Sequence, residues 1–136
     1  MLSKKTQYAL KALGYLAAKH GDGPVLIAEV SKKKKIPLKF LENILLLLKK
    51  EGILDSKKGK GGGYFFVHHP KSTTVAKALR IVEGPIALLP CVSLNFYERC
   101  KDCNQATCGL NKIMVQARDA TLKVFEKKTL QDLVDE

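Results

Sequence analysis

The pattern of apolar and polar positions over the first 52 residues predicts three helices. Apolar side chains recur at intervals of three and four over residues 3–19, and the serine at the start of this stretch is suited to cap a helix. A glycine-rich break at residues 21–24 precedes a short helix over residues 26–33. A third helix is expected to begin near Pro37 and to end at Gly52.

The third predicted helix is richer in leucine than one buried face requires. Leu41, Ile44, Leu45 and Leu48 form its buried stripe, and the whole run 45–48 is interpreted as packing against the first helix and the following hairpin.

The pattern changes after Gly52. Short apolar runs at residues 53–54 and 64–67 flank the basic, glycine-rich segment 57–63 and are predicted to be the strands of a hairpin. Two helices joined by a short turn and followed by such a hairpin have the layout of a winged helix-turn-helix. The phosphate loop of a nucleotide enzyme is a poorer match, because no Lys-Ser or Lys-Thr pair ends the glycine run and no helix follows it directly.

The second half of the chain adds two helices separated by an irregular stretch. A short helix is predicted over residues 72–82, little regular structure over 86–107, and a long helix over 109–127. The long helix has two apolar lines, one made of Leu110, Ile113, Ala117, Ala120 and Val124, the other of Val115 and Leu122. A helix with two such lines can pack on its own domain and on a second copy, so we interpret it as a dimerisation helix, with a monomeric core helix as the alternative.

The predicted fold class is therefore mainly α with a small β-hairpin wing. Residues 1–83 are assigned to a winged helix-turn-helix domain, residues 84–108 to a cysteine-bearing sensor loop, and residues 109–136 to a dimerisation helix and tail.

Charge is concentrated in the predicted winged-helix region. The chain has a net charge of +11, and residues 1–69 contain 14 lysines and 5 acidic residues, a balance of +9. Residues 70–136 contain 10 basic and 8 acidic residues, a balance of +2. A basic first half beside a nearly neutral second half predicts a polyanionic partner for the first half, and double-stranded DNA fits this helix-turn-helix layout.

The apolar N-terminal stretch is an amphipathic helix rather than a secretory core, since Lys11 interrupts it. No run is long enough to cross a bilayer, so we expect no membrane contact and a cytoplasmic location. Structural disulfides are rare in that reducing compartment, so we expect the four cysteines to have a role other than disulfide formation.

Six side chains are candidates for DNA contact. We expect the third helix to enter the major groove by its N-terminal end, where Lys39, Glu42 and Asn43 project. Glu42 could accept from a cytosine amino group and Asn43 could address adenine, although an ordinary surface charge is the alternative for Glu42. The wing lysines Lys57, Lys58 and Lys60 are expected to hold backbone or minor-groove positions. Residues 1–69 contain no arginine, so the bidentate arginine–guanine contact is excluded there.

The four cysteines, Cys91, Cys100, Cys103 and Cys108, lie within residues 91–108. Thiolates are soft ligands, and four of them suit an iron–sulfur cluster or zinc. Only one close pair exists, which is less typical of a zinc site than two pairs. A thiol switch and inert thiols remain alternatives, and so does a small iron–sulfur carrier or redox protein, which would need no operator.

Four stretches together resemble a known family. They are YALKAL at 8–13, IPLKFLE at 36–42, GKGGGY at 59–64, and VEGPI at 82–86 followed by Cys91. They resemble the winged-helix transcriptional regulators typified by IscR, NsrR and CymR, and the match covers nearly the whole chain. The resemblance implies a homodimer that binds near-palindromic operators and is not an enzyme. It further implies either a cluster in the loop before the long helix, as in many members, or sensing through a protein partner, as in the CymR branch.

The sequence departs from the familiar cluster-binding pattern of three evenly spaced cysteines. Cys91 and Cys108 match the outer positions, and either Cys100 or Cys103 could be the middle one. Relatives take a fourth ligand from a histidine just after the last cysteine or from an acid near the partner's N-terminus, but Asn111 and Gln7 stand at these positions. Our hypothesis is that the extra thiolate supplies the missing ligand to an iron–sulfur cluster, with zinc or no cofactor as alternatives.

Overall fold

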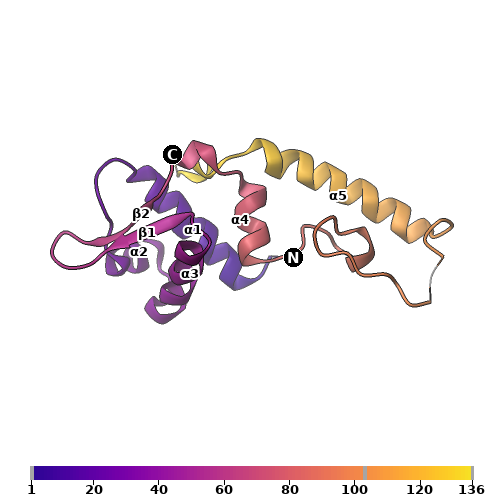
Figure 1. The fold of residues 1–136 in the computed structure, drawn as a ribbon, viewed down its shortest axis with the longest axis horizontal. Coiled ribbons are helices and arrows are strands. Elements are labelled where there is room, and N and C mark those ends of the chain that lie inside the picture. The colour runs from indigo at the N-terminus through magenta and orange to yellow at the C-terminus, as the bar shows by residue number, and fades with distance from the viewer. Residues whose placement is uncertain (1, 103, 136) are drawn as a thin grey trace.

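The computed structural model describes residues 2–102 and 104–135 (Figure 1). Its helices are α1 (Lys4–Ala18), α2 (Ile27–Lys34), α3 (Leu38–Lys50), α4 (Val75–Val82) and α5 (Gly109–Lys127). One antiparallel hairpin is formed by β1 (Leu54–Lys57) and β2 (Gly63–Phe66), and three short 3-10 segments are η1 (Pro70–Ser72), η2 (Pro90–Val92) and η3 (Leu130–Leu133). The predicted class, mainly α with a small hairpin wing, is confirmed.

Local signals in the sequence set most of the observed boundaries. Ser3 caps α1, since its side chain accepts a hydrogen bond from the Thr6 amide at 3.2 Å. The long helix α5 spans the predicted residues 109–127. The strands differ more, because β1 runs on through polar residues to Lys57, which pairs with Gly63, while Leu54 pairs with Phe66. Cross-strand hydrogen bonds, rather than apolar character, determine where these strands end.

The core lies where α1, α3, α4 and the base of the hairpin meet. Its members share apolar side chains with at most about a tenth of their surface exposed, and the largest are Leu13, Ile36, Leu41, Ile44, Leu45, Leu48, Leu54, Leu79 and Leu130. Burial of this apolar surface is the main contribution to the stability of the fold.

Two glycines allow close approaches between distant segments. Gly63 has φ +139°, and a Cβ there would lie 2.2 Å from the carbonyl oxygen of Val25. Val25 and Tyr64 exchange two backbone hydrogen bonds, of 2.9 and 2.8 Å, which tie the segment before α2 to the wing. A Cβ on Gly14 of α1 would lie 2.5 Å from the carbonyl oxygen of Leu133, so the C-terminal segment packs directly on α1.

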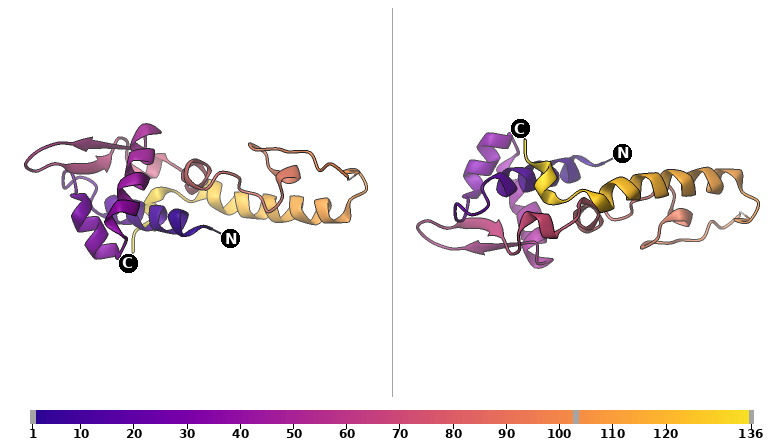
Figure 2. Two further views of the ribbon diagram at one scale, coloured as in Figure 1. Left: turned by 90° about the horizontal axis from the view of Figure 1, so that it is seen from below. Right: turned by 90° about the horizontal axis from the view of Figure 1, so that it is seen from above.

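The helix α5 projects from the winged-helix body. Residues 84–102 and 104–108 lead outward beside it, and the helix returns toward the body (Figures 1 and 2). Arg118 on α5 donates a hydrogen bond to the carbonyl oxygen of Val92 at 2.8 Å, which fixes η2 against the helix. Leu122 is buried, whereas Leu110, Ile113 and Val124 are 55%, 61% and 53% exposed. Their own chain therefore leaves more than half of each of the side chains Leu110, Ile113 and Val124 exposed.

Among the described residues, no helix is both long enough and apolar enough to cross a membrane.

Candidate nucleic-acid interface and cysteine loop

The turn between α2 and α3 holds the two helices in a fixed relation. Lys35 ends α2 in the left-handed conformation with φ +54°, and Ile36 is buried in the core at 2% exposure. The amide of Ile36 donates to the Ser31 carbonyl at 3.0 Å, and the Ser31 hydroxyl donates to the Ile36 carbonyl at 2.6 Å. Because the turn is anchored by both burial and hydrogen bonds, the orientation of α3 is well defined.

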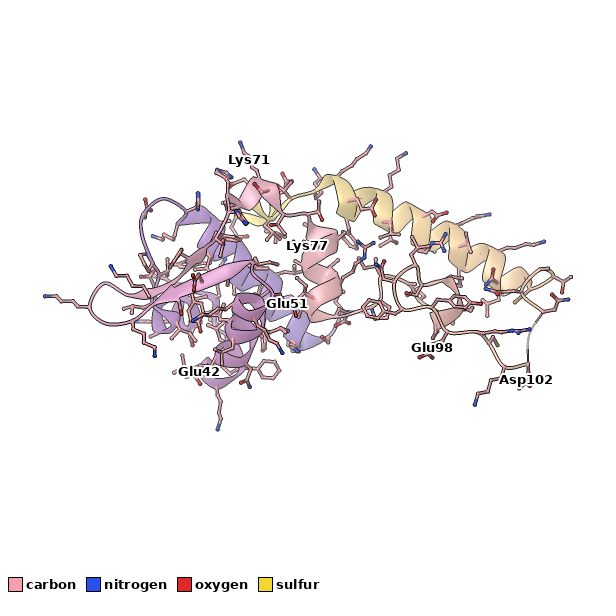
Figure 3. All side chains as sticks on the ribbon, viewed as in Figure 1. Glu42, Glu51, Lys71, Lys77, Glu98 and Asp102 are labelled. Carbon is pink, nitrogen blue, oxygen red and sulfur yellow. The ribbon has the colours of Figure 1, made fainter. Side chains whose placement is uncertain are left out.

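One side of α3 is completely buried, and the other carries the predicted contact residues. Leu41, Ile44, Leu45 and Leu48 have no exposed surface, while Lys39, Glu42 and Asn43 are exposed. Figure 3 shows Glu42 at the end of α3 that lies away from the rest of the molecule. The helix thus presents, on its exposed face, polar side chains of the kind that reach base edges in a major groove.

The wing lies next to this face. Lys57, Lys58 and Lys60 are all exposed on the hairpin. Lys49 on α3 donates a hydrogen bond to the Ser56 hydroxyl on β1 at 2.7 Å, linking the helix to the wing. Burial, together with the nearby negative charge of Glu42, raises the pKa of Tyr64 on β2. The structure therefore brings the α3 candidates and the wing candidates to one side of the domain.

The lysine run 32–35 is divided between two roles. Lys34 is half-buried and forms an ion pair with Asp135 near the C-terminus. Lys32, Lys33 and Lys35 are exposed beside the turn and add to the positive charge near α3.

Three of the four predicted thiols line a single cavity of about 310 Å³ between the 84–108 segment and the start of α5. Cys91 and Cys108 are half-buried and Cys100 is exposed, while Cys103 lies outside the described residues. Cys108 caps α5, accepting a hydrogen bond from the Asn111 amide at 3.4 Å. The Asn111 side-chain Nδ2 donates to Cys91 Sγ at 3.5 Å, so one residue holds both outer thiols.

The donor chemistry of this cavity fits a thiolate-bound group. Sulfur ligands suit iron–sulfur clusters and zinc. Within residues 2–102 and 104–135, however, no three metal-ligating side chains lie close enough together to hold one ion. Ligation by Cys91, Cys100 and Cys108 together would therefore require these three thiols to lie closer together than they do in this structure.

Asn111 and Leu46 are the two features that the sequence pattern did not reveal. Asn111 was considered only as a poor metal ligand, and its hydrogen bonds to two sulfurs depend on how the loop folds back on α5. Leu46 was assigned to packing, but it is 55% exposed on α3. Helical periodicity places Leu46 on a different face of α3 from Leu45 and Leu48, and this was the signal in the sequence that could have predicted its exposure.

A fixed helix-turn-helix followed by a basic wing defines a winged-helix DNA-binding protein. Residues 2–136 match the family model Rrf2, described as an iron-dependent transcriptional regulator. The chain belongs to the Rrf2 family, whose members are transcriptional regulators and not enzymes.

Three relatives illustrate the breadth of the family. An rrf2-like HTH-type transcriptional regulator of Rhodobacter capsulatus is 36% identical over 98% of this chain and 92% of its own. CymR of Bacillus subtilis is 30% identical over 97% of this chain and 88% of its own. Its solved structure, described as that of a global cysteine regulator, matches 98% of this chain and 95% of that one with a TM-score of 0.81 at 28% identity. IscR of Cereibacter sphaeroides is 38% identical over 62% of this chain and 56% of its own.

Proposed function

We propose that this regulator binds specific operators through the outer face of α3 and the wing. Lys39, Glu42 and Asn43 approach base edges in the major groove, and Lys57, Lys58 and Lys60 hold the phosphate backbone or the minor groove. The observation that carries this proposal is that all six side chains are exposed on two elements that Lys49 and Ser56 link together.

The regulator acts as a homodimer in this proposal. Leu110, Ile113 and Val124 form an apolar line along α5 that its own chain leaves more than half exposed. A second copy of α5 would bury this line, and two-fold symmetry would match a near-palindromic operator. A dimer of this kind is also expected to work in the cytoplasm, where its operators lie.

The 84–108 segment is the sensor in this proposal. An iron–sulfur cluster held by Cys91, Cys100, Cys103 and Cys108 is the form favoured by four soft ligands in one segment. Such a group would supply redox and oxygen sensitivity. The chain's own contribution is that Cys108 caps α5 and Asn111 bonds both outer sulfurs, which couples the loop to the start of the dimer helix.

Coupling to DNA follows from this position. A change in the loop would shift the start of α5, and a shift of α5 against its partner would alter the separation of the two α3 helices. Half-sites on one face of DNA lie about 34–36 Å apart, so a small change in that separation is enough to alter affinity.

Anaerobic purification of the full chain followed by operator selection tests the proposal. The protein should contain iron and sulfide, absorb visible light, sediment as a dimer, and enrich one palindromic sequence from random duplexes. A colourless protein with one zinc per chain after anaerobic reconstitution would disprove the cluster. A dimer that prefers no duplex over random competitor, with or without metal, would disprove the regulator model as a whole.

A second sensing mode is supported by the similarity to CymR. This alternative has three forms. The thiols are reversibly oxidised, or they bind zinc, or the signal comes from a protein partner that binds the regulator. The exposed thiol of Cys100 and the shared Asn111 contact of Cys91 and Cys108 are compatible with reversible oxidation. Loss of operator binding on oxidation of a metal-free dimer, reversed by a dithiol reductant, would favour this mode over the cluster.

A further inference from the structure

An exposed leucine lies in the middle of the outer face of α3. Leu46 is 55% exposed, whereas the preceding Leu45 is fully buried. At 3.6 residues per turn, Leu46 lies on the same face as Asn43, three residues before it, and Lys50, four residues after it. The interpretation of this leucine as core packing is therefore wrong.

The surroundings of Leu46 indicate what covers it. Lys39, Lys49 and Lys50 are exposed on the same helix. They outnumber Glu42, the one acidic residue of α3, which lies four residues before Leu46, so the surface around Leu46 has a net positive charge. Such a surface is complementary to a polyanion rather than to a hydrophobic protein patch. In the major groove of DNA the characteristic apolar group is the C5-methyl of thymine, which apolar side chains contact directly.

We propose that Leu46 contacts the C5-methyl group of an operator thymine and helps determine sequence specificity. This inference rests on the proposed entry of α3 into the major groove and adds a readout residue to it. It agrees with the absence of arginine from residues 1–69, which excludes bidentate arginine readout of guanine by this region. Asn43 and Leu46 would then read A·T pairs, while Glu42 accepts from a cytosine.

The position of this thymine is constrained. Side chains three apart on a helix have Cβ atoms about 5–6 Å apart, and successive base pairs are about 3.4 Å apart. The thymine read by Leu46 should therefore lie within about two base pairs of the adenine addressed by Asn43.

Replacement of thymine by deoxyuridine tests the contact, because it removes only the methyl group. The operator is selected from random duplexes with the full chain, and each thymine of one half-site is then replaced in turn. Wild-type affinity should fall roughly fourfold at one position, the equivalent of one lost methyl contact. The variant Leu46→Ala should bind the unmodified operator more weakly and show no further loss at that position, whereas Leu46→Met should retain the sensitivity.

Leu2→Ala provides the matched control, since Leu2 is also an exposed leucine, at 39%, but precedes α1 and lies outside both α3 and the wing. It should keep both the affinity and the sensitivity of the wild type. The inference is overturned if no thymine replacement weakens the wild type, or if the same replacement weakens Leu46→Ala equally. It is also overturned if Leu46→Ala binds every duplex as the wild type does. Failure to select any operator would instead disprove the proposed function itself.

Discussion

The side-chain amide of Asn111 on α5 donates a hydrogen bond to Cys91 Sγ at 3.5 Å, joining two residues twenty positions apart in the sequence. The backbone amide of the same residue donates to Cys108 Sγ at 3.4 Å. Asn111 is thus the point at which the cysteine-bearing segment and the long helix are held together.

Replacing Asn111 should lower the affinity for any metal or cluster that the cysteine thiols bind. Residues that hydrogen-bond to metal ligands typically contribute about 10–100-fold to affinity, so Asn111→Ala should release metal to a chelator at least about tenfold faster than the wild type. Amide hydrogen exchange around residues 90–92 should also increase in the metal-free protein. Asn95→Ala, an exposed amide in the same segment, is the control, and equal effects of both variants would argue against a special role for Asn111.

Glu83 should stabilise the fold at neutral pH and cease to do so in acid. Its carboxylate accepts hydrogen bonds from the Thr6 hydroxyl at 2.5 Å, the Ser3 hydroxyl at 2.8 Å and the Ser3 amide at 3.1 Å. The Thr6 hydroxyl, followed by Ser3, lowers the pKa of this carboxyl below its usual 4.5. The pKa is lower in the folded state, so the stabilisation is present above the unfolded pKa and is lost as pH falls through the folded value.

The variant Glu83→Gln tests this linkage. Urea unfolding at pH 7 and equal protein concentration should show a loss of about 1 kcal/mol, and the difference from the wild type should shrink toward pH 3. Glu51→Gln, which alters an exposed carboxyl at the end of α3, should leave stability within about 0.5 kcal/mol at both pH values. A pH-independent deficit in Glu83→Gln would show that the carboxylate charge is not responsible.

The wing lysines should account for part of the salt dependence of DNA binding. The double variant Lys58→Ala/Lys60→Ala should weaken binding to operator and random duplex alike, and should reduce the slope of log affinity against log salt by roughly one unit per lost phosphate contact. Lys71→Ala is the control, because Figure 3 shows Lys71 on the opposite side of the domain from Glu42. An unchanged slope in the double variant would exclude the wing from the interface.

A single methyl group at Gly63 should disrupt the attachment of the wing. In Gly63→Ala the new Cβ would meet the Val25 carbonyl at 2.2 Å in a backbone conformation that side chains rarely adopt. We expect a loss of about 2–3 kcal/mol or more in unfolding free energy. Gly59 also has a positive φ, of +88°, but nothing lies within 4 Å of a Cβ added there, so Gly59→Ala should cost only about 1–2 kcal/mol. Equal losses of unfolding free energy in the two variants would show that the clash with the Val25 carbonyl does not add to the cost at Gly63.

The two apolar lines of α5 should respond differently to mutation. Ile113→Glu places a charge on the exposed line and should dissociate the proposed dimer while leaving the monomer folded, as measured by sedimentation and circular dichroism. Leu122→Ala removes a buried side chain and should lower the unfolding free energy by about 2–4 kcal/mol. A dimer that persists in Ile113→Glu would exclude this line as the interface.

The sequence by itself determined the helices, the hairpin and the fold class, because these depend on short-range signals. Apolar spacing along α1 and α5, the Ser3 cap and the glycine-rich segment between the strands each act within a few residues. It also identified the exposed candidates Lys39, Glu42 and Asn43, whose place opposite the leucine stripe follows from helical periodicity.

Only the tertiary structure decided which distant residues meet. The packing of Leu133 on Gly14, the contact of Asn111 with Cys91 and the attachment of Val25 to the wing join positions separated by many residues. Burial of Leu45 but not Leu46, and of Leu122 but not Ile113, likewise depends on which elements pack on each helix face. The physical reason is that periodicity defines the faces of a helix, whereas the partner of each face is selected by packing of the whole chain.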